Sequence, residues 1–137
     1  MILFVLCLNP LLHYLDERLQ GLHAHRTQRK TTVIAYADDV SILITSQEDV
    51  RTVRDAIACY EKATGATLNI EKSIALAVGT WDTACEIMGI PYSEEIKILG
   101  VKTRNTVKQS ALAKLGKLTI WYARRFICSP NYGTLRK

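Results

Sequence analysis

Leucines recur at three- and four-residue steps through residues 2–22, and the charged residues 16–18 fall between them. This spacing predicts an amphipathic helix whose buried side carries Leu8, Leu11, Leu12, Leu15, Leu19 and Leu22. A second helical pattern begins at Ser46, with Asp49 as its capping partner, and ends at Gly65. Its predicted buried side carries Val50, Val53, Ile57, Tyr60 and Thr64.

Shorter runs of apolar and β-branched residues predict strands. Two of them, 31–36 and 40–45, flank residues 37–39 and form a predicted hairpin. The remaining expected elements are strands at 66–70, 73–78 and 96–101, a short helix at 81–88 and a longer helix at 106–127. The order αββαββαβα is an α+β layout, in which an antiparallel sheet is backed by helices and followed by a basic helix.

Charge divides the chain into two parts. Residues 1–96 contain 8 Lys and Arg and 13 Asp and Glu, whereas residues 97–137 contain 10 Lys and Arg and no acid. A basic segment of this kind suits a polyanion such as a nucleic acid, or is simply a solvated tail. The total length of 137 residues fits one domain with a real core.

The composition excludes several classes of protein. The four cysteines form no C-x-x-C pair and have no histidine at ligand spacing, so neither a zinc site nor a disulfide framework is expected. The apolar start lacks the basic residues and the cleavage site of a signal peptide, and Asn9-Pro10 interrupts it before it could span a bilayer. We therefore expect an intracellular protein, nuclear or cytoplasmic, without a membrane segment.

The most informative stretch is "VIAYADDVSIL" (33–43), which places Asp38 and Asp39 between two apolar runs. Neighbouring carboxylates repel one another unless a cation lies beside them. Carboxylate oxygens suit magnesium, which takes few protein ligands and completes its coordination with water and phosphates. Metal ions held in this way serve phosphoryl transfer. The simpler alternative is an ordinary turn, in which aspartate is common.

Four segments in order resemble the reverse transcriptases of non-LTR, LINE-like retrotransposons. "AYADD" (35–39) resembles motif C of the polymerase palm, and "LFVLCLNPLLHYL" (3–15) resembles the helix of motif B. "TGATLNIEKS" (64–73) resembles motif D, and "IKILGV" (96–101) resembles the primer grip, motif E. The resemblance implies an RNA-directed DNA polymerase, a nucleotidyltransferase that uses Mg (or Mn) and acts on an RNA template, a DNA primer and deoxynucleotide triphosphates.

The resemblance also implies roles for single residues. Asp38 matches the metal-binding aspartate of motif C, and Asp39 matches its supporting neighbour. Lys72 matches the motif D lysine near the phosphates of the incoming nucleotide, where it is a candidate proton donor. Tyr36, Leu99 and Gly100 match residues beside the primer. Considered singly, Tyr36 could only pack, Lys72 could be a surface lysine, and Leu99-Gly100 could mark a bend.

The family's site also takes a third aspartate, from motif A on a strand before motif B, and residues 1–137 contain no counterpart of it. We therefore expect an incomplete palm over residues 1–101, a fragment with little or no activity without the N-terminal part of the polymerase. Residues 102–137 are expected to be a basic helical segment, the possible start of a thumb. Its predicted stripe for nucleic acid consists of Lys114, Lys117, Trp121 and Arg124, although Trp121 could belong to a core.

Two other interpretations stay open. The chain could be a non-catalytic nucleic-acid-binding remnant of a retroelement, or an unfolded product without function. An effect of magnesium on stability that depends on Asp38 would favour the enzyme fragment, and binding to nucleic acid without a metal effect would favour the remnant.

Overall fold

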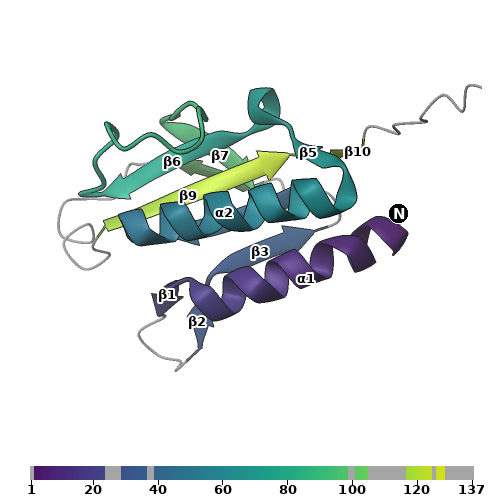
Figure 1. Cartoon of the computed structure of the whole chain (residues 1–137). Coiled ribbons are helices and arrows are strands. Elements are labelled where there is room, and N and C mark those ends of the chain that lie inside the picture. The colour runs from purple at the N-terminus through teal and green to yellow at the C-terminus, as the bar shows by residue number, and fades with distance from the viewer. Residues whose placement is uncertain are drawn as a thin grey trace, which may run out of the picture.

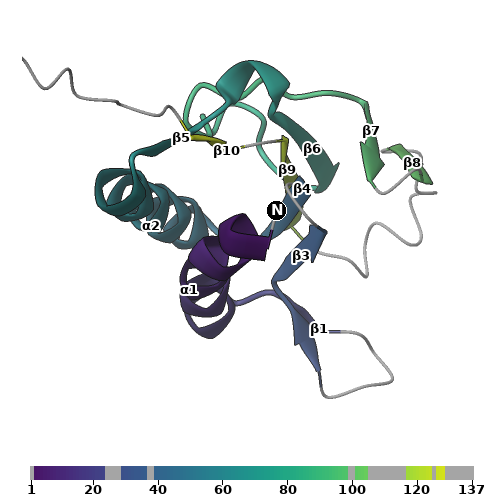
Figure 2. The same ribbon diagram turned by 90° about the vertical axis from the view of Figure 1, so that its right-hand side faces the viewer.

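Two helices lie on one face of a four-stranded antiparallel sheet (Figures 1 and 2). A computed structural model of the chain describes residues 2–23, 29–36, 39–98, 101–104, 117–124 and 126–128. The helices are α1 (Ile2–Arg18) and α2 (Gln47–Thr64). The sheet has the order β3 (Val33–Tyr36), β4 (Asp39–Ile44), β9 (Lys117–Arg124), β6 (Ile74–Gly79). This arrangement confirms an α+β fold.

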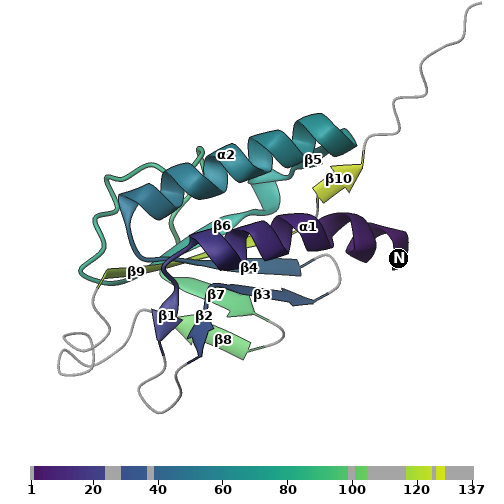
Figure 3. The ribbon, with the colours of Figure 1, turned by 60° about the horizontal axis from the view of Figure 1, so that its bottom comes forward.

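The predicted leucine stripe of α1 faces the core. Leu8, Leu11, Leu15 and Leu19 are buried, and Leu12 and Leu22 are half-buried. Pro10 lies inside the helix, which continues through it to Arg18. Figure 3 shows α1 and α2 side by side, and together they cover the sheet. No helix among the described residues has both the length and the apolar character needed to cross a membrane.

The ends of α2 follow the capping signals in the sequence. The Ser46 hydroxyl accepts a hydrogen bond from the Asp49 amide at 3.1 Å, and the Asp49 carboxylate accepts one from the Ser46 amide at 3.2 Å, so both halves of a capping box are present. Gly65 ends the helix with a φ of 71°, a backbone conformation that glycine adopts without steric cost. Of the predicted buried side, only Thr64 is exposed, and Ala56 is buried in addition.

The sheet is buried on both faces, so β4 is apolar almost throughout. Val40, Ile42 and Ile44 belong to the core beneath the helices, whereas Leu43 lies on the opposite face. There Leu43 packs in a second cluster with Leu76, Val78 and Ile96. Strands covered on both faces have continuous apolar sequences rather than alternating ones.

Three two-stranded sheets surround the main one. They are β1 (Leu22–His23) with β2 (Lys30–Thr31), β5 (Ala66–Leu68) with β10 (Phe126–Cys128), and β7 (Glu95–Ile98) with β8 (Val101–Arg104). A short 3₁₀ helix, η1 (Ile70–Lys72), precedes β6. Figure 2 shows β7 and β8 on the side of the sheet away from the helices. This hairpin supplies Ile96 to the second cluster.

The predicted helix over 106–127 is wrong wherever the structure describes it. Residues 117–124 form β9, which pairs antiparallel with both β4 and β6, and residues 126–128 form β10. The crossover from β4 through α2 to β6 leaves room for one strand between β4 and β6, and β9 fills it. The sequence "KLTIWYAR" (117–124) contains four residues of high strand propensity, and the hydrogen bonds of two neighbouring strands outweigh its helical spacing.

Two smaller predictions are also wrong. Residues 81–88 form turns instead of a helix, because the Asp82 carboxylate accepts a hydrogen bond from the Ala84 amide at 2.9 Å. The Tyr92 hydroxyl then fixes this segment by accepting a hydrogen bond from Trp81 Nε1 and donating one to the Cys85 carbonyl. Residues 96–101 are not one strand, since Ile98 at the end of β7 pairs with Val101 at the start of β8.

Candidate functional site

The acid pair of the sequence lies at the connection between β3 and β4. Tyr36, the last residue of β3, is directly opposite Asp39, the first residue of β4. The Tyr36 residue is 69% exposed, and Asp39 is half-buried. Ala37 and Asp38, which connect them, lie outside the described residues. The predicted hairpin therefore exists, and it holds Tyr36 and Asp39 at one end of the main sheet.

At this end of the sheet the edge strand β3 is exposed. Successive side chains of a strand point to opposite faces. Because Val40 and Ile42 pack beneath the helices, Asp39 and Ser41 belong to the other face. On β3, Ile34 is opposite Ser41 and is 42% exposed. Ile34, Tyr36 and Asp39 thus form an accessible strip on this face.

Strand β9 brings a basic residue to the same place. Arg124, the last residue of β9, is the register partner of Asp39 in the ladder between β9 and β4. Sequence reasoning placed Arg124 on a helix and did not connect it with the acid pair. The strand propensity of residues 117–124 is the sequence signal that could have indicated the position of Arg124. The strands that pair with this segment, however, lie far away in the sequence.

Lys72 lies at this end of the sheet as well. It is the last residue of η1, which contacts β9 and leads into β6 at Ile74, the partner of Tyr122. The Lys72 amide donates a hydrogen bond to Asn69 Oδ1 at 3.1 Å, and its side chain is exposed. The fold therefore gathers Tyr36, Asp39, Arg124 and Lys72 from four segments of the chain.

The predicted basic stripe is not helical over residues 117–124, which form β9. In a strand, positions 117 and 121 share one face and position 124 belongs to the other, so the helical spacing has no meaning here. Lys117 pairs with Gly79 at the opposite end of the sheet from Asp39. Trp121 is the register partner of Ile42 in β4 and of Ala75 in β6. Leu99, Gly100 and Lys114 lie outside the described residues.

The donor chemistry of the acid pair suits magnesium. Aspartate oxygens are suitable ligands for this ion. The two register partners of Asp39 are Tyr36 in β3 and Arg124 in β9. Within the described part of the chain, no three His, Cys, Asp or Glu residues form a group that could hold a metal ion. Asp39 is the member of the acid pair that the structure describes.

The comparison with known families decides what this hairpin belongs to. Residues 1–103 match the family described as reverse transcriptase (RNA-dependent DNA polymerase). The chain belongs to the reverse transcriptase family. The match spans both helices, the hairpin of the acid pair, η1 and β7, and it ends in β8, so that β9 and β10 lie beyond it. No curated protein and no solved structure matches the chain significantly.

Membership of the reverse transcriptase family implies a general class of substrates. Reverse transcriptases act on RNA, DNA and deoxynucleoside triphosphates, and in general they use divalent metal ions.

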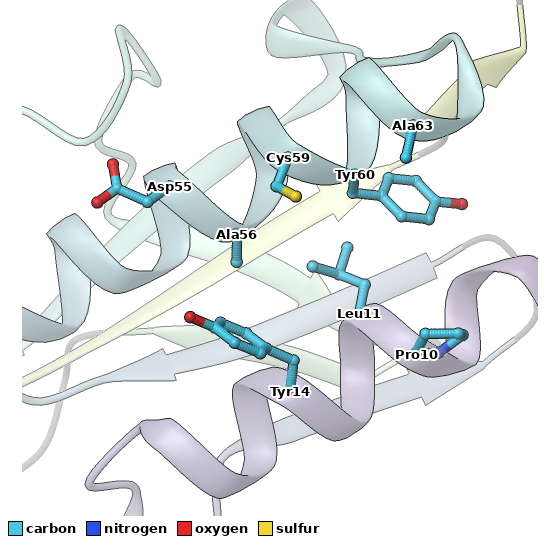
Figure 4. A pocket seen from close by; sticks show the side chains of 8 residues that line it. All are labelled: Pro10, Leu11, Tyr14, Asp55, Ala56, Cys59, Tyr60 and Ala63. Carbon is cyan, nitrogen blue, oxygen red and sulfur yellow. The ribbon is translucent and has the colours of Figure 1, made fainter.

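A second surface feature, which sequence patterns did not indicate, is an apolar groove between the helices (Figure 4). Small side chains on α2, Ala56, Cys59 and Ala63, recur at three- and four-residue steps and leave room beside α1. The full lining is Pro10, Leu11, Tyr14, Asp55, Ala56, Cys59, Tyr60 and Ala63. The groove lies in the helix layer and is separated from the acid pair by the sheet.

Proposed function

We propose that residues 1–101 are the palm portion of an RNA-directed DNA polymerase of a non-LTR, LINE-like retrotransposon. The observation that carries this proposal is the direct pairing of Tyr36 with Asp39 at the exposed end of the sheet, in a chain that belongs to the reverse transcriptase family. In the enzyme this hairpin presents the acid pair to the 3′ end of a DNA primer annealed to RNA.

The reaction adds a deoxynucleotide to the primer 3′ hydroxyl and releases pyrophosphate. Asp38 and Asp39 are the proposed ligands of Mg (or Mn), and Lys72 is proposed to lie beside the phosphates of the incoming nucleotide. Because residues 1–137 contain no counterpart of the motif A aspartate, the chain alone is proposed to have little or no polymerase activity. Primer extension by the 137-residue chain that disappears in Asp38→Ala would contradict this expectation.

The end of the sheet beside Tyr36 and Asp39 is the proposed surface for the primer and template. The exposed ring of Tyr36 offers a stacking surface for a base, and stacking on aromatic side chains does not depend on sequence. The β7–β8 hairpin on the same side of the sheet exposes Lys97, Lys102 and Arg104, which suit phosphates. Leu99 and Gly100, between these strands in the sequence, keep their proposed role beside the primer.

Binding of a fluorescently labelled RNA–DNA hybrid, measured by anisotropy, tests this proposal. Replacing Tyr36 with Ala should weaken binding about 5- to 100-fold, because one stacked base contributes about 1–3 kcal/mol. The matched control is Tyr14→Ala, which removes a tyrosine that is 42% exposed on α1 in the helix layer. The control should bind like the unchanged chain.

Phosphate contacts add a second expectation. The affinity should fall steeply as salt is raised from about 50 to about 200 mM, since binding to phosphates releases counterions. Equal losses in Tyr36→Ala and Tyr14→Ala, or an affinity that does not respond to salt, would mean that this face is not the nucleic-acid surface.

A further inference from the structure

We propose that the outer edge of β3 binds an extended peptide segment of another protein, and that a lysine or arginine side chain of this segment enters a groove between β3 and α1. Figure 1 shows β3 at one side of the main sheet, beside α1. The site is separate from the proposed polymerase surface. Ile34 and Tyr36 belong to the face of the sheet away from the helices, whereas Val33 packs against the core beneath them.

The backbone of β3 supplies the first observation. Hydrogen-bonded and non-hydrogen-bonded pairs alternate along an antiparallel ladder. The Leu43 amide donates to the Thr32 carbonyl at 2.8 Å, so the next hydrogen-bonded pair with β4 is the one that contains Ile34. The N–H and C=O groups of Val33 and Ala35 therefore point away from β4. Among the strands that the structure describes, β4 is the only one that pairs with β3, so this edge can accept an added strand.

A groove of about 370 Å³ between α1 and β3 supplies the second observation. Its lining consists of Asn9, Leu12, His13 and Asp16 on α1 and Val33 and Ala35 on β3. The two residues of β3 whose backbone groups point outward thus also form the sheet side of the groove. Since side chains alternate along a strand, every second side chain of an added strand would point into this groove. The backbone pairs would supply affinity, and the groove would select the side chain.

The charge of the groove supplies the third observation. Asp16 is exposed, and its carboxylate accepts a hydrogen bond from the Thr32 hydroxyl, which holds it beside β3. The basic residues nearby are directed elsewhere. The guanidinium of Arg18 lies 5.0 Å from the centre of the Tyr14 ring, and Lys30 Nζ donates to a backbone carbonyl after α1 at 3.1 Å. Neither of them lines the groove, which therefore suits a lysine or arginine side chain.

NMR titration of the ¹⁵N-labelled full chain with two peptide pools tests the inference. Both pools consist of capped peptides of about eight residues, composed of Thr, Val and Ser to favour an extended conformation. The fourth position is Lys in one pool and Glu in the other. The Lys pool should shift the amide signals of Val33 and Ala35, and the Glu pool should bind about fivefold more weakly or not at all. Unchanged signals with both pools, or equal binding of the two pools, would overturn the proposal.

Asp16→Asn tests the charge of the groove, and it keeps an oxygen that can accept the hydrogen bond of Thr32. This variant should bind the Lys pool about two- to fivefold more weakly, as expected for an exposed ion pair, and should lose the preference for Lys over Glu. Asp55→Asn is the matched control, because it removes an exposed carboxylate on α2 that does not line this groove. Equal losses in the two variants would show that only the overall charge matters and would refute the groove.

Ala35→Pro tests the backbone pairs. It removes an N–H group that points outward and spares the ladder with β4, because proline is tolerated in an edge strand at such a position. The variant should bind the Lys pool at least tenfold more weakly, and a thermal unfolding curve shows whether it folds. A Lys pool N-methylated at four central amides makes the same test on the unchanged chain and should not bind. Binding that survives N-methylation would refute strand addition.

A second copy of this chain is the competing occupant of the edge. Sedimentation equilibrium of the unchanged chain without peptide should show a monomer. A dimer that Ala35→Pro dissociates would assign the edge to self-association and overturn the proposal of a peptide from another protein.

Discussion

Asp49 is a buried carboxylate with a structural role. The residue is 3% exposed, and its oxygens accept hydrogen bonds from the Gln20 amide at 3.3 Å and the Thr45 amide at 2.9 Å. The Thr45 hydroxyl donates at 2.7 Å and the Ser46 amide at 3.2 Å. One side chain thus joins the segment after α1, the end of β4 and the start of α2.

Replacing Asp49 with Asn should therefore lower the free energy of unfolding by about 2–3 kcal/mol, since hydrogen bonds to a charged group contribute more than neutral ones. In addition, the NH2 group of the asparagine would face N–H and O–H groups that now donate to the carboxylate. The measurement is urea unfolding followed by circular dichroism. Asp55→Asn, at an exposed position of the same helix, is the control and should change the stability by less than about 0.5 kcal/mol. Equal losses of unfolding free energy in the two variants would show that the hydrogen bonds of Asp49 stabilise the fold no more than an exposed aspartate does.

Among the small elements, the β7–β8 hairpin has a charged pattern that responds to pH. Glu95 is opposite Arg104 at the open end of the pair, and its carboxylate is 3.4 Å from Lys102 Nζ. Lys97 and Lys102, which have the same charge, are directly opposite one another. The hydrogen bond from Arg104, with the nearby charges of Arg104 and Lys102, lowers the pKa of Glu95 in the folded chain.

The pKa of Glu95 is lower in the folded chain than in the unfolded chain. The ionised Glu95 carboxylate therefore contributes to stability at pH values above its pKa in the unfolded chain. That contribution is lost as the pH falls through the folded pKa. We expect an NMR titration to place the pKa of Glu95 below the ordinary glutamate value of about 4.3. Arg104→Gln should raise this pKa, and Lys97→Gln should leave it nearly unchanged. A pKa that does not move in Arg104→Gln would contradict the assigned cause.

The elements that the sequence predicted correctly are those with local signals. Helix α2 was predictable because Ser46, Asp49 and Gly65 mark its ends within the helix's own sequence. Strands β3 and β4 were predictable because two apolar runs flank a short connection. Strand β9 was not, since its conformation depends on two partner strands that lie far away in the sequence.

The candidate site divides in the same way. The pairing of Tyr36 with Asp39 follows from a hairpin, which local sequence specifies. The position of Arg124 opposite Asp39 follows from sheet order and register, which no short segment contains. The turns at 81–88 could not be predicted from helical spacing because the Asp82 side chain competes with the helix for backbone hydrogen bonds.

At the scale of the whole molecule, the sheet should be most stable at its centre. Amide hydrogen exchange reports local opening, and the slowest amides open only with global unfolding. We expect the amides of β4 and β9 to exchange among the slowest, because each strand has a neighbour on both sides. The amides of the two-residue strands β1 and β2 should exchange much faster. Fast exchange throughout residues 117–124 would contradict a central β9.

The central place of β9 has a consequence for how the chain is made. A ribosome releases β4, α2 and β6 before residues 117–124 leave its exit tunnel. Until then, the backbone groups of β4 and β6 that later pair with β9 have no strand partner. During that interval each edge can accept a strand from another nascent chain, which is how intertwined dimers and aggregates begin. The yield of monomer should therefore depend on how quickly translation passes from β6 to β9.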